Sequence, residues 1–412
     1  MYIVYQLGVY LYYILLFLLS PFNAKAKKWI DGRRAQKNLF EQALPKAKRI
    51  WFHFASLGEF EQGRIILEKI NKIYPEYKFV ISFFSPSGYE VRKNYALAEK
   101  VYYLPIDSPK NAKKFINHIQ PSLIFFNKYE YWYSYIKEAK TQGIPLFVSS
   151  AIFRTSQLFF KPYGGFQRQI LRLVHHFFVQ NKPSEELLKS IHIQQFSLCG
   201  DTRFDRVYEH AQVAEVDKKI IDFCGNKPVF VAGSTWSADE LLIQNLLVDF
   251  PEMKLIIVPH EISDSHIQQI TTCFKNESLC FTELNENNYF DKNVLIVNTI
   301  GMLSSIYKIA KYCYIGGGFG SGIHNTLEAA AFGKPIFFGP KYSKFQEAKD
   351  LVSLNAAKSV QHYKNLKEEI SMLNHSEKLY YTTCELARNY VSNNYGASDK
   401  IIAYLQSNNY LH

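Results

Sequence analysis

Cysteine is scarce in this chain: only six of the 412 residues are cysteines, and they form no Cys-x-x-Cys pair and no cluster with histidine at zinc spacing. The stretch before Cys199 has none, which argues against a disulfide framework and indicates a reducing, cytosolic environment for the bulk of the chain. Hydrophobic residues make up 47% and charged residues 21% of the sequence. This composition excludes a disordered tail protein, a collagen-like repeat and a multi-span transporter.

The sequence also lacks several motifs of known enzyme classes. There is no His-Glu-x-x-His, no Gly-x-Ser-x-Gly and no Gly-Lys-Ser/Thr phosphate loop, which argues against zinc-protease, α/β-hydrolase and P-loop chemistry. No Asp-x-Asp pair of the kind that holds a metal-bound nucleotide sugar is present. We therefore expect neither a bound metal nor a cofactor.

Acidic residues are outnumbered by basic ones, 37 against 48, which gives a net charge of +11. A surplus of this size favours anionic partners such as nucleic acid, an acidic membrane face or a phosphorylated substrate. Aromatic residues reach 16%, but they are spread over the chain and do not interleave with Lys and Arg in one segment. A single-strand nucleic-acid platform would require such interleaving, so we expect no nucleic-acid partner.

A long apolar run occurs at the N-terminus, where residues 2–19 contain one Gln and no charge. As a helix this run spans about 27 Å, close to the thickness of a bilayer core. We expect a membrane anchor over residues 1–24, and its tyrosines also suit an interfacial helix. The Ala24-Lys25-Ala26 sequence imitates a signal-peptidase site, but here the positive charge follows the apolar run instead of preceding it.

A basic connector, residues 25–48, follows the anchor and predicts a cytoplasmic location for the body of the protein by the positive-inside rule. Beyond it, short apolar runs alternate with helical stretches, which is typical of parallel sheets covered on both faces. These runs cover residues 50–54, 78–83, 101–104, 122–126 and 146–149, and then 228–232, 254–258, 294–297, 312–315 and 335–338.

The pattern predicts an α/β protein with two doubly wound, Rossmann-like domains that face a cleft. We expect an N-terminal domain, a linker, a C-terminal domain and a last helix that packs back on the N-terminal domain. Their predicted ranges are 49–210, 211–225, 226–385 and 386–412, respectively.

The first candidate motif is His53-Phe54-Ala55-Ser56-Leu57-Gly58-Glu59, at the end of the first predicted strand. Ligands of open α/β sheets bind at the carboxyl ends of strands. The Ser56-x-Gly58-Glu59 turn exposes backbone N–H groups, and a carboxylate at Glu59 could accept a proton from a substrate hydroxyl. An acidic residue in the first turn of a helix also complements the helix dipole, so the motif alone leaves both interpretations open.

Two further motifs predict anion sites in the second domain. The glycine-rich run 316–322 follows a predicted strand and precedes His324-Asn325-Thr326-Leu327-Glu328, so that the amides of Gly317 and Gly318 could approach a phosphate. Glu328, about one turn into the expected helix, could bind the hydroxyls of a ribose. The shorter motif Ala232-Gly233-Ser234-Thr235 places two hydroxyls ahead of another helix, where one of them could equally be a plain N-cap.

Five segments together resemble the 3-deoxy-D-manno-octulosonic acid (Kdo) transferases, in order and spacing: HFASLGE (53–59), GDTRFD (200–205), AGSTW (232–236), VPH (258–260) and GGGFGSGIHNTLEAAAFGKPIFFGP (316–340). The resemblance implies a GT-B fold and an inverting, metal-independent glycosyltransferase specific for lipid A. It implies CMP-Kdo as the donor, which is a substrate and not a cofactor, and the phosphorylated lipid A precursor (lipid IVA) as the acceptor. The matching anchor implies the cytoplasmic face of the inner membrane.

The resemblance also assigns roles to residues. Glu59 matches the catalytic base of the family, and the acceptor-side or transition-state candidates are Ser56, Gly58, Glu130 and Arg203, the last standing where the family usually has Lys. The donor-binding residues that match are Gly233, Ser234, Thr235, His260, Gly317, Gly318, Asn325 and Glu328.

The sequence departs from the family pattern at four segments, which bear on donor detail and acceptor choice. The usual Glu-Leu-Trp-Pro-Asn, Asn-Ala-Arg-Leu-Ser, Pro-Arg-His-Pro and Asp-Thr-x-Gly-Glu-Leu are here residues 130–134 (EYWYS), 150–154 (SAIFR), 259–262 (PHEI) and 298–303 (NTIGML). Two other functions therefore remain as alternatives. One is a GT-B enzyme with another nucleotide sugar, including an epimerase, and the other is a non-enzymatic protein that binds anionic membranes or nucleic acid.

Overall fold

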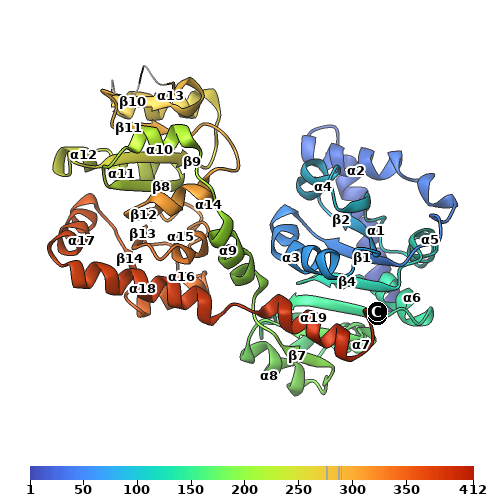
Figure 1. Ribbon diagram of the computed structural model, residues 1–412. Helices are drawn as coiled ribbons and strands as arrows, with labels where there is room; N and C mark the ends of the chain where they lie inside the picture. Colours follow the sequence, from blue (N-terminus) through green and yellow to red (C-terminus); the bar gives the residue numbers. More distant parts are fainter. Residues whose placement is uncertain (275–276, 286–287, 289) are drawn as a thin grey trace. The chain divides into compact units, whose positions relative to one another are not determined.

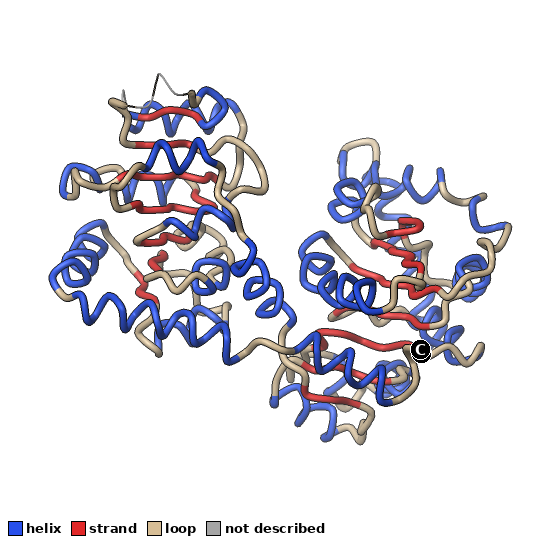
Figure 2. The backbone as a smooth tube through the Cα atoms, viewed as in Figure 1, coloured by secondary structure: helices blue, strands red, loops and turns tan. Residues whose placement is uncertain are grey.

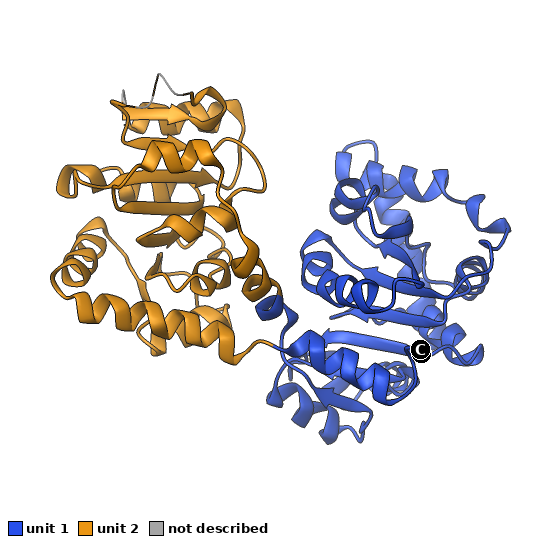
Figure 3. Cartoon of the chain, viewed as in Figure 1, with its two compact units in different colours: residues 1–205, 396–412 blue, residues 206–395 orange. Residues whose placement is uncertain are grey.

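The computed structural model describes residues 1–274, 277–285, 288 and 290–412. The chain folds into two compact units, which Figure 3 shows in different colours. Unit 1 comprises Met1–Asp205 and Gly396–His412, and unit 2 comprises Arg206–Tyr395. The division falls within helix α9 (Thr202–Val213), and α10 (Lys218–Cys224) follows in the stretch expected to be a linker.

Unit 1 is built on a parallel sheet of seven strands in the order β3-β2-β1-β4-β5-β6-β7 (Figure 1). Apolar and aromatic runs form its central strands, and every residue of β1, β4 and β5 is buried. Successive side chains point to opposite faces, so that Trp51 joins one core cluster and Phe52 the other. The strands are β1 (Arg49–Phe54), β2 (Lys78–Phe83), β3 (Ala98–Tyr103), β4 (Leu123–Asn127), β5 (Leu146–Ala151), β6 (His176–Val179) and β7 (Phe196–Leu198).

Helices lie on both sides of this sheet, as Figure 2 shows. Several begin at residues whose side chains accept a backbone N–H of the first turn, as Ser85, Ser108 and Asn181 do. The helices of unit 1 are α1 (Tyr2–Leu19), α2 (Ala24–Ala35), α3 (Leu57–Ile73), α4 (Pro86–Arg92), α5 (Pro109–Ile119), α6 (Tyr133–Thr141), α7 (Gly165–Leu173), α8 (Lys182–Ser190) and α19 (Ala397–Ser407), with 3-10 turns at Leu39–Glu41 and Leu158–Phe160.

Helix α19 comes from the end of the chain and completes the core of unit 1. The Asp205 carboxylate accepts the backbone N–H groups of Ala397, at 3.2 Å, and Ser398, at 2.8 Å, and so fixes the start of the helix. Ile401 and Leu405 are fully buried in the same cluster as Phe52. The last 17 residues therefore belong to the fold of unit 1.

Helix α1 is, among the described residues, the only helix long and apolar enough to cross a membrane. One of its faces packs on unit 1 through tyrosines: Tyr5 donates a hydrogen bond to Asp107, and the ring of Tyr12 contacts those of Trp29 and Phe84. Most of the remaining apolar side chains of α1 are exposed, Leu7 by 63% of its surface. The helix therefore has one protein-facing and one open apolar face.

Unit 2 also contains a parallel sheet of seven strands, in the order β10-β11-β9-β8-β12-β13-β14. These strands are β8 (Val229–Thr235), β9 (Lys254–Pro259), β10 (Ser278–Cys280), β11 (Val294–Ile296), β12 (Tyr312–Ile315), β13 (Ile336–Phe338) and β14 (Ala357–Ser359). The helices of unit 2, besides most of α9 and α10, are α11 (Ser237–Ile243), α12 (Leu246–Asp249), α13 (Asp264–Phe274), α14 (Leu303–Ile306), α15 (Leu327–Ala331), α16 (Gln346–Ser353), α17 (Tyr363–His375) and α18 (Glu377–Asn393), with 3-10 turns at Phe281–Glu283 and Tyr307–Ile309.

The predicted α/β class with two doubly wound parallel sheets is confirmed. Three strands were missed, namely β7, β10 and β14, because each has only three residues and contains a serine. The expected end of one strand at Ala232 was wrong, because β8 continues to Thr235. The register of β8 against β9 shifts between Gly233 and Thr235, and Ser234 between them has a left-handed φ of 54°.

Candidate active site and donor site

The candidate residues gather at one structural position in each unit. In unit 1 the sheet order reverses between the neighbouring strands β1 and β4, and in unit 2 it reverses between β8 and β12. Beyond the carboxyl ends of such strand pairs, loops diverge and leave room for a ligand. Ser56, Gly58 and Glu59 follow β1, and Glu130 follows β4. Thr235 ends β8, and the glycine-rich run begins directly after β12.

Glu59 is held in the first turn of α3, which begins at Leu57 with Ser56 as its N-cap residue. Its Oε2 accepts the backbone N–H of Ala55 at 2.8 Å, and its own carbonyl accepts the side-chain amide of Asn127 at 3.1 Å. Burial raises the pKa of Glu59 to about 7, the negative charge of Glu130 adds to this, and Lys128 acts in the opposite direction. A carboxylate with this pKa exchanges a proton readily near neutral pH.

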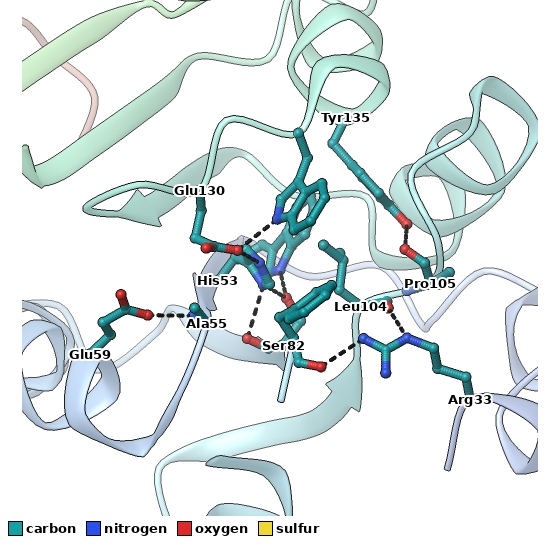
Figure 4. Close-up of polar contacts among 12 residues, drawn as sticks. Arg33, His53, Ala55, Glu59, Ser82, Leu104, Pro105, Glu130 and Tyr135 are labelled. Atoms are coloured by element: carbon teal, nitrogen blue, oxygen red, sulfur yellow. Dashed lines mark hydrogen bonds and ion pairs between the residues drawn. The ribbon is translucent and has the colours of Figure 1, made fainter. Parts of the chain in front are cut away.

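Glu130 is the second carboxylate of this site, and Figure 4 shows it with the groups that hold it. It is buried, and its Oε2 accepts Nε1–H of Trp132 at 2.6 Å and faces Nε2 of His53 at 2.9 Å. The Ser82 hydroxyl accepts Nε1–H of Trp51 at 2.7 Å and lies 2.8 Å from Nδ1 of His53. Nδ1 also lies 3.1 Å from the Ser82 carbonyl, so Ser82 holds one edge of the imidazole and Glu130 the other.

The other acceptor-side candidates differ in how they are placed. Gly58 is exposed, and an added Cβ would meet no atom within 4 Å, so the protein surface is open at this point. Arg203 is bound to Asp201, whose Oδ2 accepts its Nε–H at 2.8 Å. Burial acts to raise the pKa of Asp201, but the charge and hydrogen bonds of Arg203 outweigh it and the pKa is lowered. Gln62 of α3 donates to the same carboxylate at 2.7 Å.

In unit 2, the glycine-rich run is tied to the start of α11 by Asp239. This carboxylate is almost fully buried and accepts three hydrogen bonds, from the N–H of Gly317 at 2.8 Å, the N–H of Trp236 at 3.0 Å and the hydroxyl of Tyr314 at 2.8 Å. The expectation that the Gly317 amide binds a phosphate does not fit this arrangement, because its proton is already donated to Asp239. Its φ of 92° makes it a turn residue.

Gly318 has a packing role that the sequence motif did not suggest. A Cβ added at this position would lie 2.5 Å from the backbone of Gly339, so two chain segments meet here glycine to glycine. A side chain at Gly318 would therefore disturb the fold of unit 2 before it could obstruct a ligand. Gly233 is equally enclosed, because its Cβ would lie 2.1 Å from the hydroxyl of Tyr307.

The hydroxyls of Ser234 and Thr235 differ in their hydrogen bonding. The Thr235 hydroxyl donates to Glu240 at 2.8 Å, and Glu240 faces Nε2 of His266 at 3.1 Å, so Thr235 is fixed inside the protein. Neither residue is the N-cap of α11, which is Trp236. Ser234 is half-buried, and its hydroxyl has no hydrogen-bond partner among the described residues. It is therefore the hydroxyl of this motif that remains available to a ligand.

Three rings follow the ends of β8, β9 and β12. The imidazole of His260 stacks on that of His324, with centroids 4.3 Å apart, and lies 4.9 Å from the ring of Trp236. Trp236 Nε1–H donates to Nε2 of His324 at 3.2 Å. Burial, with a smaller effect of His260, lowers the pKa of His324 to about 4, so this imidazole is neutral at pH 7.

Asn325 and Glu328 interact with each other at the start of α15. The Asn325 side chain accepts the N–H of Leu327 at 3.1 Å and donates to Glu328 Oε1 at 3.0 Å. Glu328 was expected about one turn into the helix, but α15 begins at Leu327, so Glu328 lies in its first turn. This pair presents an amide and a carboxylate side by side, a set that can bind vicinal hydroxyls.

Several residues of these sites were not singled out from the sequence. Lys128 and Asn127 lie at the end of β4, Asp239 and Glu240 lie in the first turn of α11, and His266 lies in α13. The common signal is a polar residue just after a buried strand or at the start of the next helix, which could have found the first four. No group of His, Cys, Asp and Glu in the described ranges could hold a metal ion.

Two parallel, doubly wound sheets, each with a strand-order reversal, define the GT-B fold. A UDP-GlcNAc 2-epimerase from Neisseria meningitidis superimposes with a TM-score of 0.63 at 17% identity, covering 87% of this chain and 100% of that one. A glycosyltransferase from Rickettsia africae gives a TM-score of 0.55 at 13% identity over 88% and 99% of the two chains. These likenesses establish the fold.

The sequence comparisons show similarity to the Kdo transferases. The profile described as 3-Deoxy-D-manno-octulosonic-acid transferase (kdotransferase) matches residues 31–206. The 3-deoxy-D-manno-octulosonic acid transferase of Rickettsia bellii is 28% identical over 391 residues, which cover 90% of this chain and 92% of that protein. That of Rickettsia prowazekii is 26% identical over 383 residues, or 90% and 82% of the two chains. Residues 31–206 thus match the Kdo transferase profile, and the two relatives extend the similarity to Kdo transferases over 90% of the chain.

Proposed function

We propose that this protein transfers Kdo from CMP-Kdo to a hydroxyl of the phosphorylated lipid A precursor, lipid IVA, with inversion at the anomeric carbon of Kdo. The similarity to Kdo transferases supports Kdo as the transferred sugar, and the exact donor and acceptor are the specific content of the proposal. We assign the acceptor to unit 1, with Glu59 as the catalytic base, and the donor to unit 2.

The observation that carries this proposal is the environment of Glu59. An ordinary helix-capping carboxylate is exposed and fully ionised, whereas Glu59 is largely buried and its pKa is raised to about 7. A base of this pKa matches the pH at which the reaction must run. The open surface at Gly58, next to Glu59 in the chain, leaves room for a sugar hydroxyl to approach the carboxylate.

The chemical step balances with these groups alone. Glu59 takes the proton of the acceptor hydroxyl. At the same time the acceptor oxygen forms a bond to the anomeric carbon of Kdo, on the face opposite the leaving group. The bond from that carbon to the phosphate oxygen breaks, and CMP leaves with the electron pair. Attack from the opposite face accounts for inversion, and the protonated Glu59 then returns its proton to solvent.

On the donor side, Ser234 is the hydroxyl available to the leaving phosphate. His260 is an exposed imidazole that directly follows β9, the strand next to β8. Asn325 and Glu328 are assigned to the ribose hydroxyls. Thr235, Gly233, Gly317 and Gly318 act by holding the loops in place, because their side chains or backbones are engaged within unit 2. No metal is assigned a role.

We further propose that the protein works at the cytoplasmic face of the inner membrane, attached through α1. The helix packs on unit 1 along one face, as the contact of Tyr5 with Asp107 illustrates, and exposes apolar side chains on the other. This arrangement favours a helix that lies in the interface over one that spans the bilayer alone. The net charge of +11 suits an anionic membrane and a phosphorylated acceptor.

The test is an incubation of the purified full chain with lipid IVA under three conditions: with CMP-Kdo, with UDP-GlcNAc, or without a donor. Mass spectrometry then identifies the lipid and the nucleotide. The proposal expects lipid carrying one or more Kdo units and release of CMP only with CMP-Kdo. Turnover of UDP-GlcNAc with no change of the lipid in the presence of CMP-Kdo would favour the epimerase alternative instead.

A further inference from the structure

Two neighbouring pockets of unit 1 lie beside helix α1. The larger has a volume of about 600 Å³ and is walled by α1 residues, including Val4, Gly8 and Val9, and by the rings of Trp29, Phe84 and Trp132. The smaller has a volume of about 400 Å³ and is lined by basic residues. Both are bounded by the same short segment, Pro105 and Ile106, so the two pockets adjoin.

The smaller pocket offers uncompensated positive charge. Arg34, Lys37, Lys110 and Lys114 line it, and of these Lys114 pairs with Glu41. The other three make no ion pair within the ranges the structure describes. Cations that cluster at a concave surface without acidic partners attract a multiply charged anion such as a phosphate group.

The larger pocket offers apolar surface, and α1 forms one of its walls. Its α1 wall is the inner face of a helix whose outer face exposes Ile3, Leu7 and Leu11. A hydrocarbon chain in the bilayer could therefore pass along α1 without crossing water. Gly8 faces this space, and a Cβ added there would meet no atom within 4 Å. Glycine is unfavourable inside a helix, yet here it keeps the pocket free of a side chain.

The larger pocket also touches the candidate active site, because Glu130 is one of its lining residues. Glu130 influences Glu59 electrostatically and belongs to the site that follows β1 and β4. A ligand that fills this pocket thus extends from the membrane-facing helix to the reacting end of unit 1.

We propose that the two pockets form one amphiphilic acceptor seat: the apolar pocket under α1 takes an acyl chain of the acceptor lipid, and the adjoining basic pocket takes one of its phosphate groups. The charge complementarity of the basic pocket and its contact with the apolar one select an acylated, phosphorylated lipid as the occupant. This inference rests on the proposed function only for the identity of the lipid as acceptor.

The experiment measures lipid binding directly, without donor or turnover. The full chain in neutral detergent micelles is titrated with a diacyl phosphatidic acid that carries a photoreactive diazirine near the end of one chain. After irradiation, labelled peptides are identified by mass spectrometry. We expect saturable labelling of residues 4–12 and 104–107, and weaker labelling by the matching diacylglycerol, which lacks the phosphate.

Gly8→Phe fills the apolar pocket, and Leu7→Phe on the exposed face of the same helix is its matched control. We expect Gly8→Phe to lower the affinity for the phosphatidic acid by about tenfold, the effect of withdrawing roughly two methylene groups from burial. Leu7→Phe should leave the affinity unchanged, and thermal melting should show both variants to be folded. Equal labelling of the two variants, or labelling spread over the outer face of α1, would overturn the acyl pocket.

Binding of the phosphate group in the basic pocket is tested with the double variant Lys37→Gln/Lys110→Gln. The control is Lys113→Gln, because Lys113 is exposed on α5 and lies outside the pocket. The double variant should bind phosphatidic acid and diacylglycerol alike, whereas the control should keep the preference for phosphate. Displacement of the lipid by millimolar inorganic phosphate in the wild type, independent of chain length, would contradict a lipid seat.

Acceptor kinetics distinguish the acceptor from a bilayer phospholipid as the occupant. With lipid IVA, Gly8→Phe should raise the acceptor KM about tenfold and leave the donor KM unchanged. An unchanged acceptor KM together with lost labelling would assign the seat to a membrane phospholipid and overturn the acceptor assignment. If the wild type transfers no Kdo at all, the proposed function fails, while the labelling of the pocket still decides whether it binds a phosphorylated lipid.

Discussion

At the scale of single residues, Glu59 illustrates how environment separates a base from a helix cap. Its Oε2 accepts the Ala55 N–H as a capping carboxylate does, but burial and the nearby Glu130 hold its pKa at about 7. The folded state therefore binds the Glu59 proton more tightly than the unfolded chain, in which the pKa is near its usual value of 4.5. Ionisation of Glu59 opposes folding, and this cost appears as the pH rises from about 4.5 through 7.

The first prediction follows from the destabilising effect of the ionised Glu59 carboxylate. Glu59→Gln keeps a side-chain oxygen for the Ala55 N–H and removes the buried charge, so the variant should melt at a higher temperature than the wild type at pH 8. The difference should disappear near pH 4, where Glu59 is protonated in both states. Differential scanning calorimetry at the two pH values measures it, with the exposed Glu76→Gln as control. A variant that is less stable at pH 8 would show that the ionised carboxylate supports the fold.

The second prediction concerns the neighbours of Glu59, which act on its pKa in opposite directions. Glu130→Gln removes a negative charge that raises this pKa, so the acidic limb of kcat/KM, where Glu59 becomes protonated, should move to lower pH. Lys128→Gln removes a positive charge that lowers the pKa and should move the same limb to higher pH. Rate profiles between pH 5 and 9 test the pair, and shifts of both variants in the same direction would contradict the electrostatic account.

At the scale of elements, Asp239 joins the beginning of α11 to the loop after β12. The third prediction is that Asp239→Asn lowers the free energy of unfolding by about 1.5–3 kcal/mol, the usual contribution of a hydrogen bond to a charged group. CMP affinity should fall as well, because the loop that carries Gly317 loses its anchor. Urea unfolding and calorimetric titration with CMP measure the two effects, and the exposed Asp264→Asn is the control. Unchanged values of both in Asp239→Asn would remove this residue from the donor site.

The fourth prediction concerns α19, which lies far from unit 1 in sequence but packs in its core. Leu405 is fully buried there, so Leu405→Ala should lower the free energy of unfolding by about 2–5 kcal/mol. The exposed Ala403→Ser on the same helix should change it by less than about 0.5 kcal/mol. Deletion of residues 396–412 should leave a chain that does not fold stably. A soluble deletion variant with the melting temperature of the full chain would refute this role of α19.

The comparison of sequence and structure shows which elements can be predicted. Long apolar runs such as Lys78–Phe83 identify buried parallel strands because both faces of the sheet are covered. Three-residue strands such as β10 and β14 could not be predicted, since a short run with a polar residue fits a loop equally well. Their pairing with β11 and β13 is a tertiary effect.

The same holds for the candidate sites. Glu59 and the glycine-rich run could be located because each directly follows an apolar strand, which is a local signal. The engagement of the Gly317 amide by Asp239 could not be predicted, because it joins residues 78 positions apart and depends on β8 and β12 being neighbours. The close approach of Gly318 to Gly339 likewise depends on the fold of the loops.

At the scale of the whole molecule, positive charge, an exposed apolar helix and a GT-B fold combine in one chain. The net charge of +11 favours an anionic membrane, and the open face of α1 supplies the apolar contact. Either attraction alone gives weak, reversible binding, so the proposed attachment to the membrane depends on the two acting together. This combination suits the proposed pair of substrates, a soluble nucleotide donor and a membrane-bound acceptor.

The central claim is that Glu59 is the base of a Kdo transfer to a lipid acceptor. Its most direct test is the rate of Kdo transfer from CMP-Kdo to lipid IVA at saturating substrates and pH 8, for the wild type, Glu59→Gln and the control Glu76→Gln. The account predicts a Glu59→Gln rate about 10²–10⁴-fold below that of the wild type, the usual contribution of a general base, with unchanged CMP affinity and a Glu76→Gln rate equal to wild type. A Glu59→Gln rate within a few-fold of the wild type would contradict it.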